Sequence, residues 1–225
     1  MELGLAPEKV APFGRMPGVG GLDVEALRAR RTVSASQSRV VLMPKAYECP
    51  ASKVIPVFEA LKLCWSRIQP CEIHFTAATP EAEMWFAALP DEIRAGCRLC
   101  NRLARGGLLD LMGRARVMLA PSLTDGVPNV LYEAMASGCL PIVSPLDTLL
   151  PVFAEGVNVL FARNLYPNEI ASALVRGMTD DALVRSVVAR NSALVAELAD
   201  RNRIRDLVSR NYHELARLEH ALERG

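Results

Sequence analysis

The sequence has no long apolar run, no secretory leader pattern and no strong net charge. A membrane-spanning helix needs about 18 or more consecutive apolar residues, and no such run occurs, so we expect at most peripheral membrane contact. Residues 1–10 include acids and a lysine and lack an apolar core, which is not the pattern of a signal peptide. With a formal net charge of +1, the chain gives no general argument for binding nucleic acid. We therefore expect a cytoplasmic protein without a nucleic-acid partner.

The sequence also lacks the patterns that mark common metal and dinucleotide sites. Cys97 and Cys100 have CxxC spacing, but no second pair lies at zinc-finger distance. We therefore interpret the six cysteines as reduced, mostly buried thiols rather than metal ligands. No Asp-x-Asp motif occurs, and no Gly-x-Gly-x-x-Gly follows the first predicted strand, which argues against an unrelated dinucleotide-binding Rossmann enzyme. We predict neither a bound metal nor a cofactor.

What is present is a chain with enough apolar residues for a core. Hydrophobic residues make up 51% of the 225 residues, which suits one domain or one domain with attachments. Short apolar runs alternate with segments of helical periodicity, which predicts an α/β fold, a Rossmann-like parallel sheet with helices on both faces. The predicted strands are Arg39–Met43, Glu72–Thr76, Cys97–Leu99, Val117–Ala120, Leu140–Val143 and, at an edge, Val157–Phe161. The predicted helices are Leu22–Leu27, Pro56–Ile68, Glu81–Leu89, Leu108–Arg114, Asn129–Ser137, Asn168–Val175 and most of 180–225.

The stretch Val117–Val143 reads as strand, loop, helix and strand, and the loop before the helix is the strongest candidate site. Ligands of open α/β sheets bind beyond the carboxyl ends of the strands, where the loop Asp125–Pro128 would lie. Pro128 suits the first helical position. The amides of Asn129 and Val130 would then be free donors at the positive end of the helix dipole, which favours phosphate.

Two acids flank this expected phosphate site. Glu133 lies in a helix so apolar that most of its surface is expected to be buried, and a buried carboxylate needs partners or a ligand. Hydroxyl groups next to the phosphate could supply those partners, and Asp125 could accept from hydroxyls on the other side. A phosphate between two such acids describes a nucleoside diphosphate sugar. The alternative is that Asp125 is a turn residue and Glu133 an exposed helix residue.

Ser122–Pro141 resembles the signature of retaining glycosyltransferases of the group-1 (family 4) class, which have GT-B architecture. That signature has two acids separated by seven residues, a glycine after the first acid and Glu-Ala-Met-Ala at the second. Here it reads Asp125-Gly126 and then Glu133-Ala134-Met135-Ala136. The resemblance implies that Asp125 touches the donor sugar and Glu133 the ribose. Aspartate stands where glutamate is usual and is one methylene shorter, which leaves the choice of donor open.

The residues after the first predicted strand add a basic group to this site. Lys45 follows that strand at its carboxyl end, where it would neutralise a departing diphosphate. Lys45-Ala46-Tyr47 resembles the Lys-Gly-Tyr of some family members, and Lys53 stands near the place of a second family lysine. A surface lysine is the alternative for both, and for Lys53 it is the favoured one. The loop 100–107 is where a nucleobase could sit, and either the side chains of Arg98 and Arg102 or backbone groups of the loop would contact the base.

The resemblance covers nearly the whole chain but only the second half of a GT-B enzyme. Leu3–Val10 and Gly20–Asp23 resemble the linker between the two halves, so we assign residues 1–38 to a linker remnant. Residues 39–179 would form the donor nucleotide-sugar-binding domain, and 180–225 the helices that normally cross back to the acceptor domain. We expect an unknown acceptor, and a separate acceptor domain or a homodimer that covers these helices. The alternative function is a non-catalytic nucleotide-sugar-binding module or subunit.

The residues expected to carry the function divide into two sets. The catalytic candidates are Asp125 and Lys45. The donor-binding candidates are Glu133, Gly126, Val127, Pro128, Asn129, Val130, Lys53, Tyr47 and Arg102.

Overall fold

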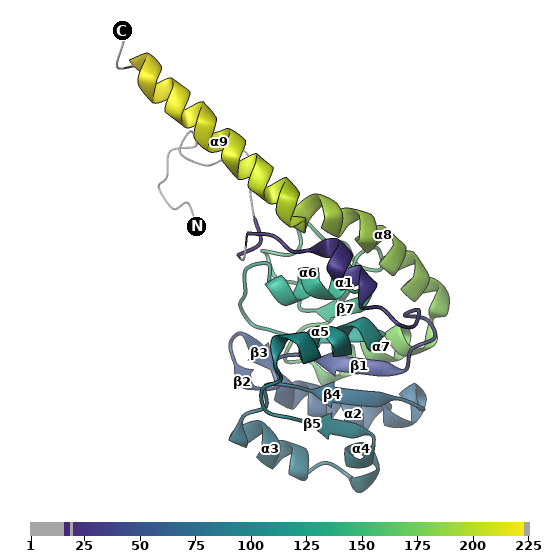
Figure 1. Cartoon of the computed structure of the whole chain (residues 1–225). Coiled ribbons are helices and arrows are strands. Elements are labelled where there is room, and N and C mark those ends of the chain that lie inside the picture. The colour runs from purple at the N-terminus through teal and green to yellow at the C-terminus, as the bar shows by residue number, and fades with distance from the viewer. Residues whose placement is uncertain (1–15, 19, 223–225) are drawn as a thin grey trace.

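The computed structural model describes residues 16–18 and 20–222 (Figure 1). The linker resemblance at Leu3–Val10 lies outside the described residues.

Six parallel strands form one sheet in the order β5-β4-β1-β6-β7-β8. The strands are β1 (Val40–Met43), β4 (Glu72–Phe75), β5 (Cys97–Leu99), β6 (Val117–Ala120), β7 (Leu140–Val143) and β8 (Leu160–Phe161). The predicted parallel α/β sheet is confirmed, and β8 lies at its edge. The last strand is shorter than predicted, because Gly156 N donates to Val159 O and folds the residues before it into a turn.

Nine helices surround the sheet within the described part of the chain. They are α1 (Val24–Ala29), α2 (Val54–Ile68), α3 (Pro80–Ala87), α4 (Asp91–Ala95), α5 (Arg105–Arg114), α6 (Asn129–Ala136), α7 (Pro167–Thr179), α8 (Asp181–Ala199) and α9 (Arg201–Leu222). The prediction that α2 begins at Pro56 is wrong by two residues, because a proline in the first turn of a helix needs no amide partner. The sequence also gave no signal for α4 or for the hairpin of β2 (Glu48–Cys49) and β3 (Ser52–Lys53).

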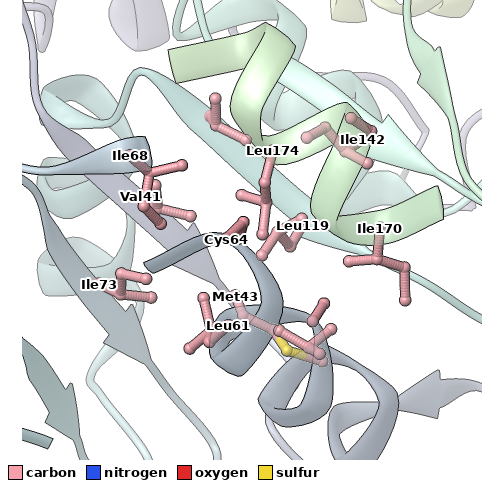
Figure 2. Close-up of a cluster of buried hydrophobic side chains, with 14 of the residues drawn as sticks. Val41, Met43, Leu61, Cys64, Ile68, Ile73, Leu119, Ile142, Ile170 and Leu174 are labelled. Carbon is pink, nitrogen blue, oxygen red and sulfur yellow. The ribbon is translucent and has the colours of Figure 1, made fainter. Parts of the chain in front are cut away.

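The core lies on both faces of the sheet, as β1 illustrates. Val41 and Met43 point to one face and Leu42 to the other, and all three side chains are fully buried. Figure 2 shows the first of these two layers, in which α2 and α7 pack on the strands. Its labelled side chains are Val41, Met43, Leu61, Cys64, Ile68, Ile73, Leu119, Ile142, Ile170 and Leu174. On the other face, α5 and α6 cover the strands, and α1 and α8 pack on α6.

A buried arginine ties the C-terminal helices to the amino end of the sheet. Arg116, directly before β6, is fully buried. Its Nε donates to the Gly177 carbonyl oxygen at 2.7 Å, and its Nη2 donates to Asp181 Oδ1 at 2.6 Å. The end of α7 and the start of α8 are therefore fixed to the central strand.

The N-terminal segment pairs with the junction between α8 and α9. Leu22 N donates to Ala199 O at 2.7 Å, and Arg201 N donates to Leu22 O at 2.9 Å. Gly21 has a φ of +94°, and a Cβ there would lie 2.6 Å from Arg201 Cα, so both its conformation and its surroundings require glycine. From this junction α9 extends away from the rest of the molecule (Figure 1).

Candidate functional site

The loop between β6 and α6 is held from both sides at the carboxyl edge of the sheet. Ser122 N donates to Ser144 Oγ at 3.0 Å, in the loop after β7. On the opposite side, Lys53 N donates to Pro121 O at 3.0 Å. The hydroxyl of Thr148 donates to the Asp125 carbonyl oxygen at 2.9 Å. The loop therefore has a fixed backbone, which a binding site for a charged ligand requires.

Helix α6 begins without a side-chain cap. Pro128 is the N-cap residue, with ψ of 137°, and its side chain makes no capping hydrogen bond to the amides of the first turn. The prediction that Pro128 is the first helical residue is therefore wrong by one position, and Asn129 takes that place. The Asn129 side chain is occupied elsewhere, because its Oδ1 accepts a hydrogen bond from Gly18 N at 3.1 Å. The backbone amides of Asn129 and Val130 stand at the positive end of the helix dipole, where an anion is stabilised.

The two residues expected to be catalytic contact each other. Lys45 Nζ lies 3.4 Å from Asp125 Oδ2, and the two side chains are 32% and 24% exposed. Lys45 comes two residues after β1, and its carbonyl oxygen accepts a hydrogen bond from the Ser52 hydroxyl in the β2–β3 hairpin. Lys45, in the connection after β1, and Asp125, in the connection after β6, therefore meet at the carboxyl edge of the sheet.

Glu133 is buried, and its partner is a residue that the sequence did not single out. The Glu133 side chain is 5% exposed, and its Oε1 lies 2.7 Å from Nη2 of Arg105. Arg105 is the first residue of α5, and its side chain is 65% exposed. The demand of a buried carboxylate for a cation was the available signal, because the predicted loop 100–107 carries two arginines, Arg102 and Arg105. Sequence alone could not tell which of them reaches α6.

A pocket of about 410 Å³ opens beside this ion pair. It lies at the carboxyl ends of β1 and β4, and its walls include Pro44, Thr76, Arg102 and Arg105. Ala77, also on its wall, has a φ of +57°, a strained conformation for a residue with a Cβ. A hydrogen bond from Ala77 N to the carbonyl oxygen of Asn101 at 2.5 Å accompanies this conformation.

Arg102 and Arg98, the two side chains expected over a nucleobase, do not lie together. Arg102 lines the pocket. Arg98 Nε lies 3.9 Å from Glu72 Oε1, on strand residues away from the pocket walls. His74 Nε2, on β4, lies 3.1 Å from the same oxygen of Glu72. The two arginines are separated because Arg98 lies within β5, in register with His74 of β4, whereas Arg102 lies in the loop beyond the carboxyl end of that strand.

Lys53 is engaged by an acid within its own hairpin. Its Nζ lies 2.6 Å from Glu48 Oε1, and the two side chains are 13% and 17% exposed. Glu48 also accepts a hydrogen bond from Ile55 N at 3.1 Å, in the first turn of α2. Tyr47, directly before β2, is half-buried. The Lys53 backbone thus supports the loop after β6, while its charge is compensated by Glu48.

The remaining predicted residues belong to the loop itself. Gly126 is exposed, and Val127, Pro128 and Val130 are half-buried. A Cβ at Gly126 would meet nothing within 4 Å, so the protein's own packing does not require glycine at this position.

The cysteines are free thiols. Burial raises the pKa of Cys64, Cys97 and Cys139 to about 12, so these thiols stay protonated at neutral pH. Across the residues that the structure describes, no group of three or more His, Cys, Asp or Glu side chains is placed to hold a metal ion. Within the same part of the chain, the helices are too short or too polar to cross a bilayer.

Comparison with known structures identifies related folds. HepE of Anabaena in complex with UDP-glucose has a TM-score of 0.70 at 14% identity, over 87% of this chain and 56% of that one. Sucrose-phosphate synthase of Thermosynechococcus elongatus gives 0.69 at 18%, over 88% and 52%. The C-terminal domain of the group 1 glycosyltransferase LpcC of Francisella tularensis gives 0.65 at 14%, over 79% and 97%. The chain therefore spans about half the length of the first two proteins, and the likeness shows a shared fold.

Sequence comparison identifies the family. No curated protein sequence matches the chain significantly. The family model for glycosyl transferases group 1 matches residues 38–180, which is more than half of the chain and includes the loop before α6, both acids and the pocket. The chain belongs to the group 1 glycosyltransferases.

Proposed function

We propose that this chain is the donor-binding half of a retaining glycosyltransferase that transfers a sugar from a nucleoside diphosphate sugar to an acceptor. The observation that carries the proposal is the arrangement around the start of α6. An uncapped helix N-terminus stands between two acids, and each acid has a basic partner from a different crossover. HepE, which shares the fold, was solved with UDP-glucose, so UDP-glucose is a reasonable first donor to test.

In the proposed mechanism, the protein stabilises negative charge on the departing nucleoside diphosphate. The Lys45 ammonium and the amides of Asn129 and Val130 would face the phosphates. Asp125 would accept hydrogen bonds from the sugar and Glu133 from the ribose, and the pocket of about 410 Å³ would take the base. The lysine and the helix end supply positive charge, so the proposal needs no metal ion. Retention is proposed from the resemblance to retaining members, and the anomeric configuration of the product tests it.

A non-catalytic nucleotide-sugar-binding subunit is the second candidate, and the ion pairs favour it. Lys45 is paired with Asp125, and Lys53 with Glu48, so the two lysines expected near the diphosphate are both compensated. A site with less net positive charge stabilises a leaving diphosphate less. Binding of UDP-glucose without transfer, even when an acceptor-binding half is supplied, would favour this candidate.

Calorimetry with UDP-glucose tests the proposed site. Replacing Glu133 by glutamine removes the charge that would accept from the ribose hydroxyls, and we expect the affinity to fall about tenfold or more. Glu83→Gln, an exposed acid on α3, serves as the matched control and should leave the affinity unchanged. Equal affinity of wild type and Glu133→Gln, with both proteins folded by circular dichroism, would contradict the ribose role.

A further inference from the structure

The Glu133 carboxylate is buried, so its orientation decides which hydrogen-bond donors it can reach. Its neighbours along α6, Tyr132 and Ala134, are buried, and its own side chain is 5% exposed. Few water molecules can reach such a group, so its hydrogen bonds must come from fixed protein atoms or from a ligand. Arg105 provides the fixed partner, at 2.7 Å from Oε1.

Arg105 connects this carboxylate to the pocket. It begins α5 and forms part of the pocket wall, while its guanidinium reaches Oε1 of Glu133 on the neighbouring helix. A nucleotide whose base fills the pocket and whose phosphates reach the start of α6 would place its ribose next to this pair. The guanidinium is planar and donates in fixed directions, so its hydrogen bond from Nη2 at 2.7 Å holds Oε1 of Glu133 in place and limits how far the carboxylate can turn.

We propose that Arg105 is a positioning residue that holds Glu133 for the ribose hydroxyls, and that it thereby sets a preference for ribonucleotides over deoxyribonucleotides. This inference rests on the proposed function, because it concerns the same donor site. A carboxylate held in one orientation pairs with a ribose hydroxyl and is left with an unmet hydrogen bond when that hydroxyl is missing. A carboxylate free to rotate can find another partner, which weakens the discrimination.

Arg102 is a matched control for the proposed role of Arg105 in positioning Glu133. It lines the same pocket as Arg105 and carries the same charge. The ion pairs of the described residues join Glu133 to Arg105 and not to Arg102. Loss of either arginine lowers the positive charge around the pocket, but only the loss of Arg105 releases the carboxylate.

The test measures a ratio of affinities rather than one affinity. Calorimetry would compare UDP, GDP and ADP, each with its 2′-deoxy and 3′-deoxy forms, for wild type, Arg105→Gln, Arg105→Lys and Arg102→Gln. Wild type is expected to bind the best ribonucleotide about tenfold or more tightly than at least one of its deoxy forms. Arg105→Gln should bring that ratio to within about twofold of unity, and Arg105→Lys to an intermediate value. Arg102→Gln should keep the wild-type ratio even if its affinities for all nucleotides fall.

Each outcome decides between the two proposals. A wild-type ratio in Arg105→Gln, or a wild type that binds ribonucleotides and their deoxy forms equally, would overturn the positioning role and leave donor binding intact. A wild type that binds none of the three nucleoside diphosphates would overturn the proposed function and the inference with it. If Arg105→Gln unfolds by circular dichroism, Arg105→Lys decides, and an unchanged ratio there would overturn the inference.

Discussion

The acids of the candidate site each contact a cation that comes from a distant part of the chain. Asp125 pairs with Lys45, and Glu133 with Arg105, across separations of 80 and 28 residues. The sequence could predict Lys45 and Asp125 because the family resemblance names their positions. It could not predict Arg105, because no local pattern shows which basic side chain contacts a buried carboxylate on another helix. It could not predict the ion pair of Lys53 with Glu48 either, because the hairpin that brings these two residues together leaves no sequence pattern.

Lys45→Ala tests the role of the first cation. We expect the variant to bind UDP about tenfold or more weakly, because the lysine would face the phosphates, and to bind uridine with unchanged affinity. Calorimetry with both ligands makes the comparison. Lys62→Ala, which removes an exposed lysine paired with Glu59, is the control. An equal loss of affinity for uridine and UDP in Lys45→Ala would contradict the phosphate contact.

At the amino end of the sheet, opposite the candidate site, Asp181 makes the free energy of unfolding depend on pH. The hydrogen bond and charge of Arg116 lower the pKa of Asp181 below its usual value. The folded protein therefore releases this proton more readily than the unfolded chain, and the stabilisation is present above a pH of about 4, near the unfolded pKa. As the pH falls through the lower pKa of the folded state, the stabilisation is lost.

Urea unfolding at several pH values checks this dependence. We expect Asp181→Asn to be less stable than wild type at pH 7 and to lose less stability than wild type when the pH is lowered below about 4. Parallel curves for the two proteins across this range would show that the pair with Arg116 does not contribute. Asp206→Asn, on the exposed surface of α9, is a control with the same chemical change.

At the scale of elements, apolar runs predicted the strands well because each strand is buried on one or both faces. Val117–Ala120 and Leu140–Val143 begin and end where the sequence placed them. The two-residue strands β2 and β3 and the five-residue α4 are too short to show a period, so no sequence pattern marks them. The predicted start of α6 at Asn129 is confirmed, and only the position of Pro128 was misassigned, because a proline suits both the N-cap and the first helical position.

Two glycines of α5 should respond to alanine in opposite directions. A Cβ at Gly113 would lie 2.6 Å from the Arg30 carbonyl oxygen, so Gly113→Ala forces the helix away from its neighbour and should cost about 1–3 kcal/mol. A Cβ at Gly107 would meet nothing within 4 Å, so Gly107→Ala should stabilise the helix by about 0.5–1 kcal/mol. Urea unfolding measures both changes, and a Gly113→Ala variant as stable as wild type would contradict the close packing at Gly113, whereas a loss of stability in Gly107→Ala would contradict the open space there.

For the whole molecule, α9 is the helix that extends away from the sheet and the helices around it (Figure 1). Ile204 in its first turn is buried, while Tyr212 and Leu215 are 68% and 50% exposed. Apolar residues recur at helical spacing along this segment and form a stripe, and the resemblance to GT-B enzymes implies that this stripe contacts an acceptor domain.

Adding an acceptor-binding half from a GT-B relative tests this reading. We expect the chain alone to bind UDP-glucose without transfer, and the mixture to transfer the sugar, as measured by formation of glycosylated acceptor. Leu215→Lys should lower the restored transfer severalfold while leaving the affinity for UDP-glucose unchanged, because it alters only the exposed stripe. Transfer by the chain alone would contradict the half-enzyme proposal, and sedimentation would show whether a second copy covers α9 instead.

The hydrogen bonds of Leu22 with Ala199 and Arg201 attach the start of α9 to the N-terminal segment. Four residues before Leu22, Gly18 N donates to Oδ1 of Asn129, the first residue of α6. Two residues close together in the sequence therefore contact the starts of two helices, α6 beside the candidate site and α9, which projects from the rest of the molecule (Figure 1).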